Sequence, residues 1–191
     1  PNVAFLAVLA LSAVVGGKPP SSFLKLAAFA PMVLVPALLR WLPRIDPKRD
    51  NYKQFRGTLS VIIILTTGFF AFIHVLTLSA PLGWQFDTPR LIMAGASLLF
   101  VALGVLMPSI SAQNYFIGIR TPWTLEDPEV WRQTHRLGGV LFIVGGLIGV
   151  VGSLLLPPAY GFTAVMAGVL LAAVGSIAGS WWIYRQLHAK D

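Results

Sequence analysis

The chain has 191 residues, of which 56% are hydrophobic and 11% are charged, and its net charge at pH 7 is +7. Soluble globular domains carry about 25% charged residues, so this composition excludes a soluble domain and predicts a surface that faces lipid. The sequence has no cysteine, which excludes disulfide bonds and thiolate metal sites.

Six apolar segments are expected to form transmembrane helices, since a bilayer core about 30 Å thick requires roughly 20 helical residues. Residues 3–15 are a short first segment, which we interpret as the remaining part of a span. The other segments are residues 23–42, 58–79, 91–107, 137–156 and 161–184. The sequence therefore predicts an all-α, polytopic bundle of about six spans that forms a single transmembrane domain over residues 1–191.

The basic residues predict the orientation of this bundle. Eleven of the fourteen Lys and Arg fall at one end: Arg40, Arg44, Lys48, Arg49, Lys53, Arg56, Arg120, Arg132, Arg136, Arg185 and Lys190. Because Lys and Arg concentrate in cytoplasmic loops, we expect the 43–56 loop, the 109–136 loop and both termini to be cytoplasmic. The expected location is the cell membrane.

The basic loop at residues 43–56 contains Arg44, Lys48, Arg49, Lys53 and Arg56. We interpret it as a loop that sets topology and contacts anionic membrane lipids. The alternative is a docking surface for an acidic partner or for one associated with nucleic acid. A loop pressed to the membrane is poorly placed to bind nucleic acid directly, so no direct contact with nucleic acid is expected.

One ionisable residue, His74, lies deep in the 58–79 span. Ionisable groups inside a membrane are costly and are often functional, but a neutral imidazole costs less than a charged group. We therefore favour a buried, hydrogen-bonded histidine, with a proton or ligand site as the alternative. No acidic residue lies inside any expected span and no internal repeat is evident, which disfavours a transporter.

Small residues recur at four-residue spacing in the last two expected spans. One face carries Gly145, Gly149 and Ser153, and the other carries Gly168, Ala172, Ser176 and Ser180. Such faces let helix backbones approach closely in lipid. We interpret them as packing faces within the chain, with a homodimer face as the alternative.

The loop and helix start at residues 109–136 contain many residues with restricted geometric roles. Gly118 is expected to permit a backbone conformation or a close approach that other residues resist, and Pro122 restricts the residue before it to extended geometry. Asp127-Pro128-Glu129 is a strong helix start, with an N-cap, a proline in the first turn and an acid near the N-terminus. We expect this helix to continue without a break into the 137–156 span.

The early turns of that helix are expected to place Trp131, Thr134, His135 and Gly138 on one side. Thr124 with Asp127 offers a second, overlapping capping pattern. Because the local acids are accounted for by the helix start, no catalytic residue is predicted. The sequence also shows no metal-ligand spacing and no glycine loop for phosphate, so we expect no metal site, no cofactor and no enzyme activity.

A longer pattern runs through the same loop. It reads Asn114-x-x-x-Gly118-x-Arg120-Thr121-Pro122-Trp123-Thr124, followed by Trp131-x-x-Thr134-His135-Arg136. This pattern resembles the signature of the SdpI-type immunity protein family, as does the stretch Ile45-Asp46-Pro47-Lys48-Arg49. The resemblance extends over about residues 30–155, and the loop is its specific part.

The resemblance implies a multi-spanning bacterial membrane protein that gives immunity to a toxic peptide. It also implies signal transduction, in which the protein holds a small transcriptional repressor at the membrane. The signature residues would then fix the spans relative to one another and present a partner surface. The alternatives are a structural or accessory subunit beside neighbouring membrane subunits and, less favoured, a small transporter.

Overall fold

A computed structural model describes residues 22–79 and 83–189, so the expected span at residues 3–15 lies outside the described residues. The described part is helical and contains no strand, which confirms the all-α prediction. Its long helices are α2 (Ser22–Ile45), α3 (Arg56–Ser79), α4 (Thr88–Leu106), α6 (Pro128–Leu155) and α7 (Pro158–Leu187). Its short helices are η1 (Arg49–Phe55), η2 (Met107–Ser109) and α5 (Pro122–Glu126).

Four helical stretches in the described part are long and apolar enough to cross a membrane. They are Arg49–Ser79, Thr88–Ser109, Pro128–Leu155 and Pro158–Leu187, and each contains most or all of one expected span. The chain is therefore a multi-pass membrane protein. The expected span at residues 23–42 lies within α2, which stays helical although it contains Pro31, Pro36 and Pro43.

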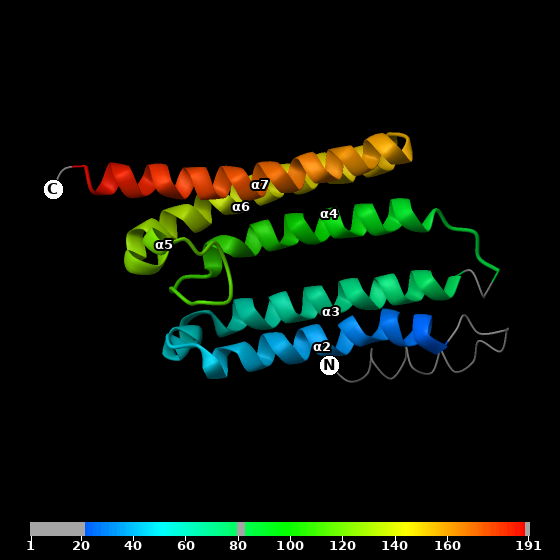
Figure 1. Cartoon of the computed structure of the whole chain (residues 1–191), viewed down its shortest axis with the longest axis horizontal. Coiled ribbons are helices and arrows are strands. Elements are labelled where there is room, and N and C mark those ends of the chain that lie inside the picture. The colour runs from blue at the N-terminus through cyan, green and yellow to red at the C-terminus, as the bar shows by residue number, and fades with distance from the viewer. Residues whose placement is uncertain (1–21, 80–82, 190–191) are drawn as a thin grey trace.

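The long helices alternate in direction along the chain, with α2 beside α3, then α4, then α6 and α7 (Figure 1). Helix α6 packs extensively against both α7 and α4, whereas α3 contacts α4 less than it contacts α2. The described bundle thus consists of a helix pair, α2 and α3, and a helix trio, α4, α6 and α7. One end holds η1, α5 and the end of α7, and we call it the loop end (Figure 1).

The small-residue faces lie between helices of the same chain. A Cβ atom added to Gly145 of α6 would meet the backbone of Gly168 on α7, and one added to Gly168 would meet the backbone of Gly145. A Cβ at Gly149 would meet Ser97 of α4. Because neighbouring helices of this chain fill these faces, the interpretation of packing within the chain is confirmed.

Substituting Gly145 by alanine is therefore expected to destabilise the helix trio by about 1–3 kcal/mol, because the added methyl group has no room against a backbone. Gly68 in α3 is the matched control, since a Cβ there meets no atom within 4 Å. Gly68→Ala should be neutral or slightly stabilising, because alanine is the better helix former. Thermal unfolding of both variants in detergent measures the difference, and equal melting temperatures would contradict the close contact.

His74 is buried within α3, with 2% of its surface exposed. Its position agrees with the expectation of a buried residue deep in a span. The choice between a structural histidine and a proton or ligand site stays a prediction.

Candidate functional site at the loop end

The segment between η2 and α6 folds through two consecutive helix starts. Thr121 adopts an extended conformation, with φ −112° and ψ 160°, as Pro122 requires of the residue before it. Thr121 and Thr124 form a capping box at the start of α5, in which each side chain bonds the other residue's backbone N–H. The sequence interpretation missed α5 and paired Thr124 with Asp127 instead, because two capping patterns overlap there.

The start of α6 agrees with its prediction. Oδ1 of Asp127 accepts from the backbone N–H groups of Glu129 at 2.6 Å and Val130 at 3.2 Å. These bonds satisfy N–H groups that have no partner inside the helix. Helix α6 then runs unbroken from Pro128 to Leu155, so the first turns at the loop end are rigidly joined to a membrane span.

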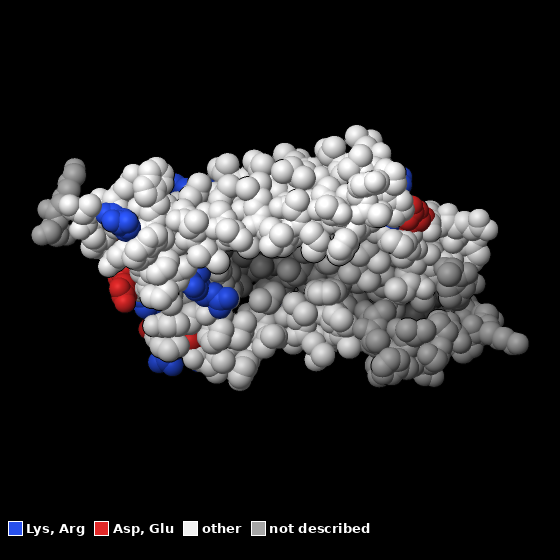
Figure 2. All heavy atoms as spheres, turned by 45° about the horizontal axis from the view of Figure 1, so that its top comes forward, with Lys and Arg blue, Asp and Glu red and all other residues white. Residues whose placement is uncertain are grey.

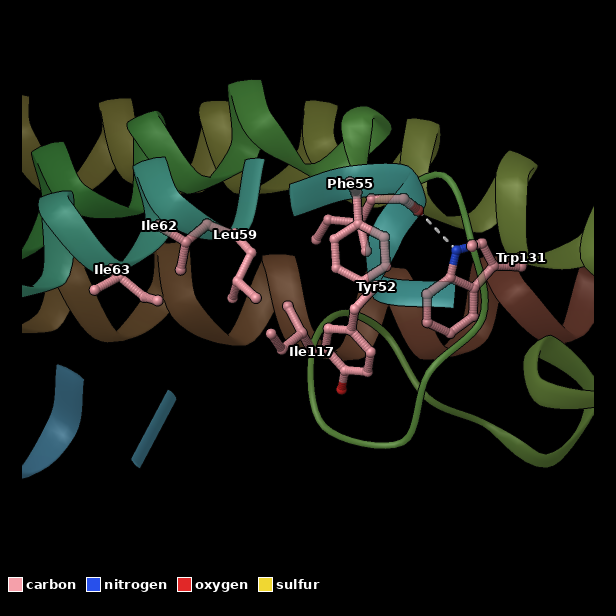
Figure 3. Close-up of a cluster of buried hydrophobic side chains, with 9 residues drawn as sticks. Tyr52, Phe55, Leu59, Ile62, Ile63, Ile117 and Trp131 are labelled. Atoms are coloured by element: carbon pink, nitrogen blue, oxygen red, sulfur yellow. Dashed lines mark hydrogen bonds between the residues drawn. The ribbon is translucent and has the colours of Figure 1, made fainter. Parts of the chain in front are cut away.

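Trp131 lies at the centre of the loop end, with 1% of its surface exposed. Its indole N–H donates to the carbonyl of Ile110 at 2.8 Å, and its ring stacks on that of His135 with centroids 4.0 Å apart. Figure 3 shows Trp131 beside Tyr52 and Phe55 of η1, in a buried apolar cluster that continues along α3. One side chain of α6 thereby contacts both the helix pair and the loop after α4.

His135 uses both of its ring nitrogens inside the protein. Nδ1 lies 2.8 Å from the carbonyl oxygen of Trp131, so Nδ1 carries the proton and donates it. Nε2 then accepts from the backbone N–H of Ile119 at 3.2 Å. A protonated imidazolium would set two N–H groups against each other, so this geometry holds the ring neutral and leaves no nitrogen for acid–base work.

Gly118 makes this contact possible. Its φ is +103°, a conformation that favours glycine. A Cβ atom at this position would also collide with Nε2 of His135. The expected requirement for glycine therefore has two physical causes, backbone conformation and close approach.

Asn114 shapes the loop that approaches α6 and is fully buried, with 0% exposure. Its Oδ1 accepts from the backbone N–H groups of Phe116 at 3.1 Å and Ile117 at 2.7 Å. Its Nδ2 donates to the carbonyl of Ala112 at 3.3 Å. The side chain thus replaces backbone partners inside a tight turn, which an asparagine does readily.

Asp46 is a buried carboxylate that the sequence interpretation did not single out, with 3% exposure. Its Oδ1 accepts from the backbone N–H of Lys48 at 2.7 Å. Its Oδ2 accepts from the hydroxyl of Tyr52 at 2.7 Å and from the backbone N–H of Tyr115 at 2.9 Å. Asp46 therefore bonds the end of α2 to the loop after α4. The stretch Ile45-Asp46-Pro47-Lys48-Arg49 gave no sign of this long-range partner.

Lys48 also bonds within the protein. Its Nζ donates to the side chain of Gln113 at 3.1 Å and to the carbonyl of Leu125 at 2.8 Å. The second contact places a cation at the C-terminal end of α5, where the helix dipole favours positive charge. The sequence interpretation also missed Gln113. Its side-chain amide donates to the backbone carbonyl of Thr124 at 2.8 Å. Its backbone carbonyl accepts from the side-chain amide of Asn51 at 2.8 Å.

These contacts form one unit, which we call the loop junction. Its members are Asp46, Lys48, Tyr52, Gln113, Asn114, Gly118, Trp131 and His135. The junction joins the helix pair to the helix trio at the loop end. Within residues 22–79 and 83–189, no group of three or more His, Asp or Glu side chains is placed to hold a metal ion.

Comparison with known proteins finds similarity over the same segment. Residues 110–183 match the SdpI/YfhL protein family. Immunity protein SdpI of Bacillus subtilis (strain 168) is 29% identical to the chain over 141 residues, which cover 72% of this chain and 67% of that protein. The chain is thus similar to the SdpI/YfhL family over residues 110–183. No solved structure matches the chain.

The structure places most of the SdpI signature inside the loop junction or against it. The buried members are Asn114, Thr121, Thr124, Trp131, Thr134 and His135. The exposed members are Arg120, Pro122 and Arg136, and Gly118 and Trp123 are partly buried. The indole N–H of Trp123 donates to the hydroxyl of Ser180 on α7 at 2.9 Å. Most of the SdpI signature thus connects segments of this chain, and only the exposed members can meet a partner.

The predicted basic loop divides in the same way. Lys48 belongs to the loop junction, whereas Arg44, Arg49, Lys53 and Arg56 are exposed. Lys53 forms a surface ion pair with Asp50 at 2.6 Å. Four of the five basic side chains therefore remain on the surface of the protein, close to where its spans begin.

Proposed function

We propose that this chain is an integral membrane immunity and signalling protein that protects against a toxic peptide. The observation that carries the proposal is the SdpI/YfhL match over residues 110–183, which contain five of the eight loop-junction residues, all of α6 and most of α7. The similarity to Immunity protein SdpI supports the same role. The multi-pass helical architecture suits a protein that meets its toxin at the membrane.

We also propose that the chain works without catalysis. Asp127 is occupied as a helix cap and Asp46 accepts three hydrogen bonds. Both nitrogens of His135 are bonded to backbone groups. A general acid or base needs a free position for its proton and access to substrate. Asp46 and His135 are buried, and Asp127 is committed to capping α6.

We propose a topology of six spans with both termini in the cytoplasm. Lys and Arg gather at the loop end in the visible face of the molecule (Figure 2), which supports a cytoplasmic loop end by the positive-inside rule. Arg90 lies at the opposite end, where it is neutralised by Asp87 at 3.2 Å and donates to the carbonyls of Leu154 and Leu156 at 3.3 Å. In this topology α2 and residues 3–15 supply the two spans beyond the four described above.

We further propose that a small repressor docks on the exposed signature residues Arg120, Pro122 and Arg136. The buried members are committed to contacts within the chain, so these three are the part of the signature that a partner can reach. The guanidinium of Arg136 is exposed, and that of Arg120 donates one bond to the carbonyl of Tyr115 at 2.6 Å. Both retain donors that suit acidic groups on a partner.

The immunity role can be tested in Bacillus subtilis cells that lack their own SdpI and are exposed to the toxic peptide it protects against. Expression of this chain should restore survival. The double variant Arg120→Ala/Arg136→Ala should keep protection but lose repressor recruitment by roughly tenfold or more, since charged interface contacts are worth about 1 kcal/mol or more each. The fraction of a fluorescent repressor at the membrane provides this second readout.

Arg185→Ala is the control, because Arg185 is an exposed arginine near the end of α7 that lies outside the signature. Membrane levels of all variants are compared by immunoblotting. No rescue by a well-expressed wild-type chain would refute the immunity role. Unchanged recruitment by the double variant would refute the docking surface alone.

A further inference from the structure

A second feature of the loop end is a pocket between the end of α2, η1 and the start of α3. It has a volume of about 580 Å³, and five basic side chains line it: Arg40, Arg44, Arg49, Lys53 and Arg56. Two come from α2, two from η1 and one from α3. Three separate elements thus direct cations toward one space.

The charge in this pocket is not balanced by the protein. Asp50 is the acidic residue in the lining, and it is paired with Lys53 at 2.6 Å. Within residues 22–79 and 83–189, no side-chain hydrogen bond or ion pair engages the guanidinium groups of Arg40, Arg44, Arg49 and Arg56. Elsewhere in the described part, Arg90, Arg120 and Arg132 each bond a protein oxygen. Clustered like charges repel one another, so an anion in the pocket would be stabilising.

The pocket wall is apolar where it continues along α3. Leu59 and Ile63 line it, with 9% and 6% of their surfaces exposed. They follow Arg56 at spacings that put all three on one face of the helix. All three belong to the stretch Arg49–Ser79, which is long and apolar enough to cross a membrane. The pocket is therefore cationic toward the loop end and apolar toward the membrane interior.

We propose that this pocket binds the phosphate headgroup of an anionic phospholipid. The guanidinium groups would hold the phosphate oxygens with paired N–H donors, a geometry that arginine provides and lysine does not. The glycerol and the first part of an acyl chain would lie against Leu59 and Ile63. Phosphate next to hydrocarbon is the chemistry of a lipid, whereas a soluble acidic peptide would use only the cationic part. Basic pockets between membrane helices bind lipid headgroups in this way.

The bound headgroup would act as a bridge between α2, η1 and α3. All three elements contribute residues to the pocket lining. Tyr52 belongs both to this lining and to the loop junction. Neutralising four guanidinium groups at this place would strengthen the attachment of α2 to α3. The site is independent of the proposed repressor surface, because it contains none of the exposed signature residues.

The test uses the purified 191-residue chain in nanodiscs that contain either phosphatidylcholine alone or phosphatidylcholine with phosphatidylglycerol. Phosphatidylglycerol should raise the melting temperature of the wild type and should remain bound in native mass spectrometry. The variant Arg40→Gln/Arg49→Gln should lose the shift, with affinity for phosphatidylglycerol lower by roughly tenfold or more. Equal melting temperatures of variant and wild type in phosphatidylcholine alone show that the variant is folded.

The double variant Arg132→Gln/Arg185→Gln removes the same charge from the loop end outside the pocket and should behave as the wild type. If both double variants lose the stabilisation by phosphatidylglycerol equally, the pocket is not a specific site, and the lipid acts by general attraction between the basic loop end and a negative surface. Inorganic phosphate in detergent should give no stabilisation comparable to that of the lipid. If phosphate alone or a polyglutamate peptide reproduces the shift, the lipid proposal is wrong and a soluble anion or an acidic peptide is the occupant.

Discussion

Replacement of Trp131 by alanine is expected to lower the free energy of unfolding by about 3–5 kcal/mol, the range found for large aromatic side chains in cores. The indole is 1% exposed and fills the contact between α6, η1 and the loop after α4. Loss of the indole also removes its hydrogen bond to the carbonyl of Ile110 and its stacking on the ring of His135. An alanine leaves a cavity that the rigid start of α6 cannot close.

Trp182 provides the matched control, because its ring is 64% exposed on α7. Trp182→Ala should change stability by less than about 1 kcal/mol. Chemical unfolding in mixed micelles, followed by the remaining tryptophan fluorescence, measures both variants. In cells, Trp131→Ala should also reduce immunity in proportion to the protein lost from the membrane. A Trp131→Ala protein as stable as Trp182→Ala would refute the central position of Trp131 in the loop junction.

Replacement of Gly118 by alanine is expected to have the second largest effect, about 3 kcal/mol or more. A left-handed backbone conformation costs a residue with a Cβ roughly 1–2 kcal/mol, and the collision with Nε2 of His135 adds the cost of displacing Ile119 from its hydrogen bond. The two costs combine because the same methyl group causes both.

Gly83 separates these two costs. It also has a positive φ, +77°, but a Cβ there meets no atom within 4 Å. Gly83→Ala should therefore show only the conformational cost, about 1–2 kcal/mol. Gly57→Ala should be neutral, because Gly57 lies in open space on α3 and has no positive φ. Melting temperatures in detergent give the ranking. If Gly118→Ala and Gly83→Ala have the same effect, the close approach to His135 does not contribute.

Local features of the loop end could be predicted from sequence because their causes are local. Asp127-Pro128 starts a helix through bonds to the next few N–H groups, and Gly118 has the positive φ that its position in the loop suggested. The four candidate spans follow from the lengths of their apolar runs. Such features depend on residues within a few positions of one another, where spacing alone indicates the partner.

The partners across the loop junction could not be predicted in this way. Asp46 and Tyr115 are 69 positions apart, and no periodicity in either loop identifies one with the other. Lys48 was interpreted with the surface cations because a charge count treats all five basic side chains alike. Only the packing of α2 and α3 beside the helix trio brings its ammonium to the carbonyl of Leu125.

The long separations within the loop junction have a consequence for biosynthesis. Lys48 and Leu125 are 77 positions apart, and a ribosome adds about 5–20 residues per second. Lys48 is therefore synthesised roughly 4–15 s before Leu125. During that interval Asp46 and Lys48 can bond only to nearby residues and to water, because Gln113, Tyr115 and Leu125 have not all been made. The loop junction can close only once the start of α6, which carries Trp131 and His135, has been made.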